Sequence, residues 1–433
     1  MSAARRVAVD VLVRVDDGAF TQAVLPAALR SSNLDLRDRA FVTDLVSGST
    51  RMRGALDHLV GQVIDRPVSD LDPRVRAGLR IGAYQLVRGI PPHAAVGETV
   101  DAVGGRARGY VNAVLRKLTT LGPAWPWPSG DDPAALAIRT SHPRWLVERL
   151  VDDLGPEDAL GVLDADNRAP ALTLRARRGR ASFEELALEL RGQGATVEEG
   201  QLVPDALVVK GVGDPARLPA VIEGRATPQD QASQAVAMLV EARLGDRVVD
   251  VAAAPGGKAT AIAEGGADVV ALDVDAGRLR MVGDAARRLD LHVSRVQADG
   301  RALPIRGASF DRVLVDAPCT GLGVLRRRPD ARWRLEPSAV SELARLQRQL
   351  LSAASEAVAP GGLLVYAVCT LTNAETIEID HWMKGVFGDF EPVELPGAPW
   401  QPIGRGARLL PQARGTDGMY LLRLRRNPSG PSR

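Results

Sequence analysis

The two cysteines of this chain, Cys319 and Cys369, are its clearest candidates for chemistry. Cys319 lies in D-A-P-C-T-G-L-G, residues 316–323, and Cys369 lies in Y-A-V-C-T, residues 366–370. Each follows an apolar segment that predicts a strand, and the strands of a parallel sheet bring their carboxyl ends to one edge. A single cysteine is more often a small buried apolar residue. Because both thiols fall at the same predicted edge, we expect a nucleophilic thiolate with a second thiol beside it.

A glycine-containing loop at the end of another predicted strand is a candidate binding site. The run D-V-A-A-A-P-G-G-K, residues 250–258, is followed at once by a helical pattern. Its glycines allow close approach of a ligand, and a helix N-terminus presents free N–H groups, although a tight turn that only requires glycine is the alternative. The signature G-x-G-x-x-G is absent, which disfavours nicotinamide chemistry. The expected ligand-binding residues are Ala252, Ala253, Ala254, Pro255, Gly256, Gly257 and Lys258.

Aspartates follow two further predicted strands. Asp273 stands about twenty residues after the glycine loop, where a carboxylate accepts hydrogen bonds from the ribose hydroxyls of a nucleoside cofactor. Asp299 follows the next strand and is a candidate acceptor for an adenine amino group. Alone, each aspartate is more often a helix cap or a turn former. At successive strand ends, they favour a nucleoside cofactor.

The elements that must position these residues alternate between strand and helix from Val236 onward. Apolar strands are predicted at 247–251, 269–274, 312–315 and 363–368, with helical patterns between them. This alternation is typical of α/β folds with a parallel, doubly wound sheet, in which ligands bind beyond the carboxyl ends of the strands. We therefore expect one site just after these strands.

The N-terminal part of the chain, from Ala4 to about Leu121, has a mostly helical pattern. Valines at every second position from Val7 to Val15 favour a strand by propensity, although no partner hairpin follows. Basic residues on the predicted helices form either a solvated face or an RNA-facing surface. They are Arg74, Arg76, Arg80, Arg88, Arg116 and Lys117.

The middle of the chain is predicted as a separate module. A proline- and tryptophan-rich stretch at 123–130 indicates a domain boundary. After further helical residues, a strand at 172–176, a helix at 183–190 and a strand at 206–210 predict a small α/β module that ends near Gly224. The expected domains are a helical domain at 1–125, linker helices and the small module at 126–225, and the α/β domain at 226–427, with a disordered tail at 428–433.

The composition is that of a globular protein, and its net charge of +2 does not by itself identify a nucleic-acid partner. No apolar run approaches the length of a membrane span, and the N-terminus lacks the pattern of a secretion signal, so we expect a cytoplasmic protein without a membrane partner. Two cysteines exclude a disulfide framework and are too few for a cysteine-based zinc site. Because the five histidines lack ligand spacing, we expect no metal.

The runs A-A-A-P-G-G-K, D-A-P-C-T-G-L-G-V-L-R-R-R-P-D and Y-A-V-C-T together resemble the RNA cytosine-5 methyltransferases of the Sun type, over roughly residues 227–425. The resemblance implies a C-terminal Rossmann-like class I methyltransferase domain that uses S-adenosyl-L-methionine. It implies that Cys369 is the nucleophile and that Cys319 assists release of the methylated product. The residues it places around the cofactor are Ala252 to Lys258, Asp273, Asp299 and Asp316.

Methylation of cytosine at C5 needs a nucleophile because this ring carbon is too weak to take a methyl group unaided. A thiolate that adds to C6 turns C5 into an enamine carbon, which attacks the sulfonium methyl. Negative charge pushed toward N3 must also be met. Asp316, if protonated or sharing a proton, is the candidate to donate to N3 and to accept from the amino group.

The N-terminal region, with R-G-Y-V-N-A-V-L-R-K-L at 108–118, is similar to the NusB-like RNA-binding domain of the bacterial 16S ribosomal RNA subfamily. This similarity implies an all-α N-terminal domain and a helix at 7–15. It also implies an RNA partner, either 16S rRNA or a small-subunit assembly intermediate. In that subfamily the middle stretch contributes to RNA docking, a role for which Arg175, Arg177 and Arg178 are the candidates here.

Some positions depart from the family pattern or have two interpretations. Ala252 stands where many relatives have a further cysteine, and N-A-E-T at 373–376 replaces a frequent P-E-E-N. Trp333 and its neighbouring arginines form either an RNA-binding surface, with the indole stacked on a displaced base, or a packed tryptophan among solvated arginines. These arginines are Arg326, Arg327, Arg328, Arg332 and Arg334.

The amino-acid sequence leaves three alternative functions open. A DNA cytosine-5 methyltransferase would attack with the cysteine that matches Cys319 and would not require Cys369. A non-catalytic assembly factor would hold RNA with its NusB-like domain, but both thiols and an intact glycine loop argue against lost turnover. The third alternative is a cytosine-5 methyltransferase with another RNA as its substrate.

Overall fold

The computed structural model describes residues 2–428, so residues 429–433 of the predicted tail lie outside the described residues. The chain forms two compact units. The first comprises residues 2–152, 166–168 and 325–335, and the second comprises the stretches between and after them. Within the described part of the chain, no helix has both the length and the apolar character that a membrane span requires.

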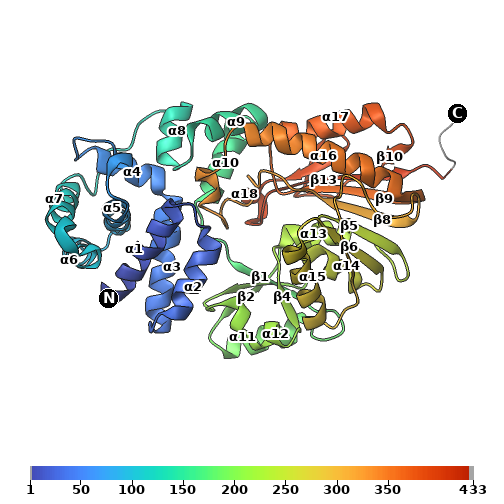
Figure 1. Ribbon diagram of the computed structural model, residues 1–433, viewed down its shortest axis with the longest axis horizontal. Helices are drawn as coiled ribbons and strands as arrows, with labels where there is room; N and C mark the ends of the chain where they lie inside the picture. The colour runs from blue at the N-terminus through green and yellow to red at the C-terminus, as the bar shows by residue number, and fades with distance from the viewer. Residues whose placement is uncertain (1, 429–433) are drawn as a thin grey trace. The chain divides into compact units, whose positions relative to one another are not determined.

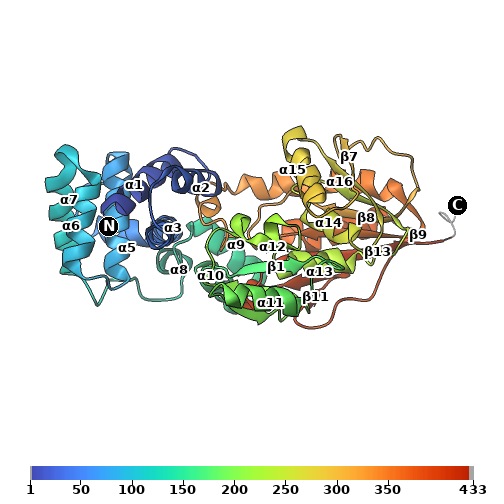
Figure 2. The same cartoon turned by 90° about the horizontal axis from the view of Figure 1, so that it is seen from below.

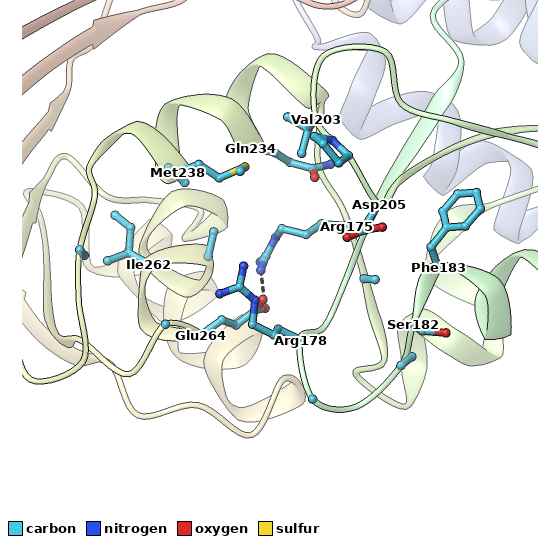
Figure 3. Close-up of a pocket in the computed structure, with 18 of the residues that line it drawn as sticks. Arg175, Arg178, Ser182, Phe183, Val203, Asp205, Gln234, Met238, Ile262 and Glu264 are labelled. Carbon is cyan, nitrogen blue, oxygen red and sulfur yellow. Dashed lines mark ion pairs between the residues drawn. The ribbon is translucent and has the colours of Figure 1, made fainter. Parts of the chain in front are cut away.

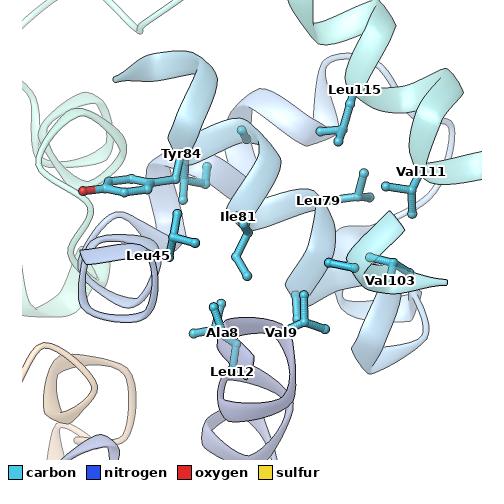
Figure 4. Packing of buried hydrophobic residues seen from close by; sticks show 14 of the residues in the cluster. Ala8, Val9, Leu12, Leu45, Leu79, Ile81, Tyr84, Val103, Val111 and Leu115 are labelled. Carbon is cyan, nitrogen blue, oxygen red and sulfur yellow. The ribbon is translucent and has the colours of Figure 1, made fainter. Parts of the chain in front are cut away.

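The first unit is helical, as predicted. Its helices are α1 (Ser2–Asp16), α2 (Thr21–Ser31), α3 (Leu36–Arg51), α4 (Arg53–Gly61), α5 (Pro73–Val87), α6 (Pro92–Val103), α7 (Arg108–Thr119), α8 (Pro133–Arg139) and most of α9 (Arg144–Leu154). Helices α1, α3, α5, α6 and α7 pack together around its core (Figures 1 and 2). Figure 4 shows Leu12, Leu45, Ile81 and Leu115 among the buried side chains at its centre.

Residues 7–15 belong to helix α1, so the strand favoured by propensity is wrong and the helix implied by the resemblance is right. Ala8, Val11 and Leu12 follow helical spacing and are buried against the neighbouring helices. The preference of valine for strands amounts to a few tenths of a kcal/mol per residue. Burial of one helical face outweighs it.

Two of the arginines predicted on a basic face are held inside this unit. Arg76 and Arg80 both contact Asp16, at N···O distances of 2.9 and 2.8 Å. Arg80 also contacts Asp57 at 2.7 Å, and its side chain is buried. Neither a solvated face nor an RNA-facing surface therefore describes Arg80, because its charge is matched by carboxylates within the unit.

The segment 325–335, which follows the Cys319 loop in sequence, also packs in the helical unit. Arg332 is 0 % exposed and donates to the carbonyls of Ser141 and Asp166, both at 3.1 Å. Trp333 Nε1 donates to the Thr50 carbonyl at 2.9 Å. The RNA interpretation is therefore wrong for Arg332 and Trp333. The packed-indole interpretation holds for Trp333, except that Arg332 beside it is buried rather than solvated.

The second unit contains a small antiparallel sheet with the strand order β2-β3-β1-β4. Its strands are β1 (Leu172–Ala176), β2 (Thr196–Glu199), β3 (Ala206–Lys210) and β4 (Ala226–Pro228). Helices α11 (Phe183–Gly192) and α12 (Pro219–Ile222) pack against it (Figure 1), and α10 (Pro156–Asp166) precedes it. The two strands and the helix predicted in this module are confirmed; the sequence pattern does not predict β2 and β4.

The second unit also contains a larger mixed sheet. Its strands are β5 (Arg247–Val251), β6 (Asp268–Asp273), β7 (Ser294–Gln297), β8 (Phe310–Asp316), β9 (Val358–Val368), β10 (Phe390–Pro392), β11 (Gln401–Ile403), β12 (Gly406–Leu409) and β13 (Met419–Arg426). Its helices are α13 (Gln231–Leu239), α14 (Gly257–Ala263), α15 (Ala276–Arg288), α16 (Ser338–Ala357), α17 (Ile377–Val386) and α18 (Pro411–Arg414).

The order of the larger sheet is β11-β12-β13-β9-β8-β5-β6-β7, with β10 paired to β13. Strands β5 to β9 are parallel, as predicted, but β10 to β13 pair antiparallel, which corrects the expectation of a purely parallel sheet. Short connections join β11 to β12 and β12 to β13, and such connections suit antiparallel neighbours. The chain order reverses at β5, which lies between β6 and β8, and ligands bind at such a switch point.

Candidate active site

The structure brings the two thiols together. Cys319 follows β8, Cys369 follows β9, and these strands are parallel neighbours in the larger sheet. The two Sγ atoms lie 3.4 Å apart, and both cysteines are half-buried rather than sealed in the core. The Cys369 carbonyl accepts from Gly323 N at 2.9 Å, which ties the two loops together. A pair of thiols at one sheet edge is what the sequence predicts.

The two thiols are electrostatically distinct. Their mutual hydrogen bond lowers the pKa of Cys369 below its ordinary value, against the opposing effect of burial, and nearby Lys258 favours the thiolate further. The same hydrogen bond, together with burial, raises the pKa of Cys319 well above its ordinary value. Cys319 is therefore the donor of this hydrogen bond and Cys369 is the candidate thiolate.

Lys258 and Asp316 act on the Cys369 thiol, and a further aspartate, Asp250, lies near this pair. Lys258 Nζ lies 2.7 Å from Asp316 Oδ2. Burial lowers the pKa of Lys258, but the attraction of Asp316 outweighs it and the net pKa is raised. Asp250 is fully buried, and neither of its carboxylate oxygens has a hydrogen-bond partner among residues 2–428. Burial, reinforced by Asp316, raises the pKa of Asp250 well above its ordinary value.

The glycine loop lies at the carboxyl end of β5. Gly256 has a φ of +102°, and a Cβ added there would lie 3.0 Å from the Val282 Cα, so only glycine suits this position. Ala254 N donates to Asp273 Oδ2 at 3.3 Å, which links the loop to the end of β6. Helix α14 begins at Gly257 directly after the loop. The strand, loop and helix predicted here are confirmed.

The other two predicted carboxylates differ in their surroundings. Asp273 ends β6 and is only 2 % exposed. Asp299 follows β7 and is paired with Arg301 at 2.6 Å, and hydrogen bonds from Arg301 lower the pKa of Asp299 to about 2. Parallel pairing of β6 with β7 places both at the carboxyl edge of the sheet.

A buried glutamate that the sequence interpretation does not single out joins the two cysteine loops. Glu375 accepts from Thr320 N at 2.9 Å and from Thr320 Oγ1 at 2.6 Å, next to Cys319. It also accepts from Thr370 Oγ1 at 3.1 Å, next to Cys369, and is fully buried. Threonines around the N-A-E-T run are the one sequence signal for this network. Glu375 therefore positions both thiols without contacting either.

A cavity of about 590 Å³ lies elsewhere in the second unit (Figure 3). Arg175 at its wall is buried and paired with Glu264, and it donates to Gln229 Oε1 at 2.7 Å. The cavity is lined by neither cysteine. Arg175 thus joins β1 to α14 and is not available for RNA docking, whereas Arg178 is exposed.

Among residues 2–428, no three His, Cys, Asp or Glu side chains gather as a metal-binding group. The carboxylates at the strand ends and the N–H groups of the glycine loop fit a nucleoside cofactor with a charged amino-acid end. A buried carboxylate at the end of β6 suits hydroxyl groups, and the partnerless carboxylate of Asp250 suits a positively charged group nearby. The loop backbone and the start of α14 add further donors.

Related sequences cover nearly the whole chain. The Mycobacterium tuberculosis protein Rv1407 is 38% identical over 98% of this chain and 96% of its own. The ribosomal RNA small subunit methyltransferase B of Pseudomonas putida is 34% identical over 92% of this chain and 93% of its own. The crystal structure of the protein PH0851 superimposes with a TM-score of 0.82, at 26% identity over 98% of both chains.

The Rossmann-like sheet, with its glycine loop and carboxylates at the switch point, defines an S-adenosylmethionine-dependent class I methyltransferase. Residues 237–425 match the family described as 16S rRNA methyltransferase RsmB/F, residues 2–120 match the NusB family, and residues 142–214 match the ferredoxin-like domain of RsmF/B-like methyltransferases. The chain belongs to the family of RsmB/F ribosomal RNA methyltransferases.

Proposed function

We propose that this chain transfers the methyl group of S-adenosylmethionine to C5 of a cytosine in 16S rRNA through a covalent bond between Cys369 and C6. The observation that carries this proposal is the 3.4 Å separation of the Cys319 and Cys369 Sγ atoms at the ends of neighbouring strands. When bound, the cofactor supplies the methyl group on a sulfonium. Membership of a ribosomal RNA methyltransferase family supports the substrate, which we propose is 16S rRNA, free or in a small-subunit assembly intermediate, in the cytoplasm.

The proposed cofactor site combines the glycine loop with the carboxylates at the strand ends. Asp273 accepts from the ribose hydroxyls, and Asp299 accepts from the adenine amino group. Asp316 lies between the cofactor and the target base. The proposed loop residues are Ala252, Ala253, Ala254, Pro255, Gly256, Gly257 and Lys258.

In the first step, the Cys369 thiolate forms a bond to C6 of the cytosine, and the C5–C6 electron pair becomes available at C5. Lys258 Nζ donates to Asp316 Oδ2 at 2.7 Å, and this pair is the proposed donor to N3 while Asp316 accepts from the amino group. C5 would then take the methyl group of the bound cofactor, whose sulfur would keep the electron pair of the broken C–S bond and leave as a neutral thioether.

In the second step, Cys319 removes the proton from C5, and the bond between Cys369 and C6 breaks to restore the double bond. Cys319 holds its own proton while Cys369 is anionic, because the hydrogen bond to that thiolate raises the pKa of Cys319. Once Cys369 is bonded to carbon, this effect is removed. Cys319 then loses its proton to solvent and acts as the base.

The test uses Cys319→Ala and Cys369→Ala variants, each mixed with small-subunit RNA and cofactor and run on denaturing gels. Cys319→Ala should accumulate a protein–RNA crosslink, because attack survives and release fails. Cys369→Ala and the double variant should give none. A crosslink from Cys369→Ala alone would make Cys319 the nucleophile, as in DNA cytosine-5 methyltransferases.

The position and the kind of RNA need a separate measurement. Mapping of 5-methylcytosine in total RNA from a deletion strain should show one lost site, in 16S rRNA. Loss of a site in another RNA would correct the substrate, and an unchanged map would favour a non-catalytic assembly factor.

A further inference from the structure

The helical unit contains a cavity of its own, of about 220 Å³. Its walls come from α1, from the junction of α3 with α4, from α5 and from the segment 325–335. All of its lining residues belong to the helical unit. The charged residues at its wall are Asp16, Arg53, Arg80, Asp330 and Arg334.

Two of the three arginines in this cavity are matched by carboxylates. Arg80 contacts Asp16 at 2.8 Å, and Arg334 contacts Asp330 at 3.3 Å. Arg53 differs, since no hydrogen bond or ion pair of its guanidinium is found within residues 2–428. Its described contact is with the Trp333 ring, whose centroid lies 5.5 Å from Cζ. Asp57 also contacts Arg80, and Arg76 shares Asp16, so four arginines face three aspartates and Arg53 is the arginine without a paired carboxylate.

The surroundings of Arg53 compensate this charge only in part. Burial lowers the pKa of Arg53 and the nearby Arg80 lowers it further, and the attraction of Asp16 and Asp57 does not outweigh these two effects. A cation taken partly out of water without a partner is unfavourable, and an anion placed beside it removes that cost. The Trp333 ring covers the guanidinium of Arg53, and both residues line the cavity.

A second polar group at the wall also has no partner. Ser49 is 0 % exposed, and its Oγ has no hydrogen-bond partner among the described residues. Ser49 lines the same cavity as Arg53. Buried hydroxyls are normally hydrogen-bonded, so a group that is partnerless in the free protein indicates a ligand that completes it.

We propose that this cavity binds a phosphate group, with Arg53 as the charged ligand and the Ser49 hydroxyl as a further donor. A guanidinium matches the geometry of phosphate oxygens and binds them through two parallel hydrogen bonds. A cavity of this volume takes a phosphate with its attached sugar or several waters. The phosphate belongs either to an RNA backbone or to a free phosphate ion. The proposal does not depend on the methyl-transfer chemistry at the cysteines.

The first arm of the test measures RNA binding by the full chain as a function of salt concentration. Arg53→Met keeps an apolar contact with Trp333 but removes the charge. If the phosphate is part of the RNA, this variant should bind about tenfold more weakly, and the slope of log affinity against log salt should be shallower by about one unit. Arg53→Lys should keep the slope. Arg30→Met, at an exposed position on α2, is the control for net charge.

The second arm measures the thermal midpoint of the full chain in inorganic phosphate, with chloride at equal ionic strength as the reference. Phosphate should raise the midpoint of the natural protein and not that of Arg53→Met or Ser49→Ala. Without phosphate, Ser49→Ala should be no less stable than the natural protein, because the lost hydroxyl has no partner. That control separates a lost ligand from a damaged fold.

The outcomes separate the two sources of phosphate. A changed RNA slope, with competition by inorganic phosphate, assigns the cavity to the RNA backbone. A phosphate-dependent midpoint with an unchanged RNA slope assigns it to a free phosphate ion. If neither the slope nor the midpoint distinguishes Arg53→Met from the natural protein, the cavity is not a phosphate site.

Discussion

Each thiol of the pair determines the protonation state of the other. Cys369 has a lowered pKa because it accepts a hydrogen bond from Cys319, and Cys319 has a raised pKa for the same reason. The hydrogen bond across 3.4 Å therefore favours a thiolate on Cys369 and a thiol on Cys319. This arrangement gives the two thiols opposite shifts in pKa although both follow parallel strands of one sheet.

Removal of the Cys319 thiol should raise the pKa of Cys369. A thiolate is present above its pKa, so a lowered pKa extends reactivity toward lower pH, and Cys319→Ala should move it back toward higher pH. The measurement is the alkylation rate of Cys369 by iodoacetamide across a pH series, with Cys319→Ser as the variant that keeps a donor. An unchanged profile in Cys319→Ala would show that the hydrogen bond does not control the thiolate.

The two carboxylates proposed to bind the cofactor, Asp273 and Asp299, should contribute unequally to cofactor affinity. Asp273→Asn keeps the shape of the side chain but removes an acceptor that is nearly buried, so cofactor affinity should fall at least tenfold. Asp299→Asn should lower cofactor affinity by less, because Asp299 is partly exposed and paired with Arg301. Calorimetric titration with S-adenosylmethionine measures both. Asp268→Asn, at the exposed opposite end of β6, should bind as the natural protein does.

Among the secondary-structure elements, the parallel strands β8 and β9 are each followed by a loop that carries one of the two cysteines. The buried carboxylate of Glu375 joins these two loops. The Glu375 network connects the start of α17 with the loops after β8 and β9. Gln347 of α16 donates to the same carboxylate at 3.1 Å. Because these groups are buried together, displacement of one loop also displaces the other.

Glu375→Gln should therefore reduce turnover more than cofactor binding. An amide replaces one of two accepting oxygens with a donor, which leaves hydroxyl or N–H donors around Thr320 without a partner and costs about 1 to 3 kcal/mol. Single-turnover methylation and cofactor titration separate the two effects. Glu378→Gln, an exposed change in the first turn of α17, is the matched control. Equal losses of binding and turnover would mean that the network supports the whole domain rather than the thiol loops.

Local pattern and long-range contact explain which parts of this site the sequence predicts. The strands before the cysteines are continuous apolar runs, and glycines mark the cofactor loop, so their positions follow from local chemistry. The role of Glu375 depends on Thr320, 55 residues away in sequence, and no local pattern contains that contact. The antiparallel strands β10 to β13 are short, and their pairing is likewise set by the tertiary fold.

At the scale of the whole molecule, the chain enters the helical unit three times, at residues 2–152, 166–168 and 325–335. The last entry directly follows the loop that carries Cys319. Its anchor is Arg332, which donates to the Asn167 side chain at 2.9 Å as well as to backbone carbonyls. The helical unit is therefore completed by residues that a continuous N-terminal segment does not contain.

Arg332→Met should destabilise the protein by about 3 to 5 kcal/mol, because it removes a buried cation that faces Asp166 and leaves the carbonyls around it without their donor. Arg328→Met, an exposed arginine of the same segment, should change stability by less than about 0.5 kcal/mol. Urea unfolding followed by circular dichroism compares the two variants. Equal midpoints would contradict this prediction and would show that the segment lies on the helical unit without holding it together.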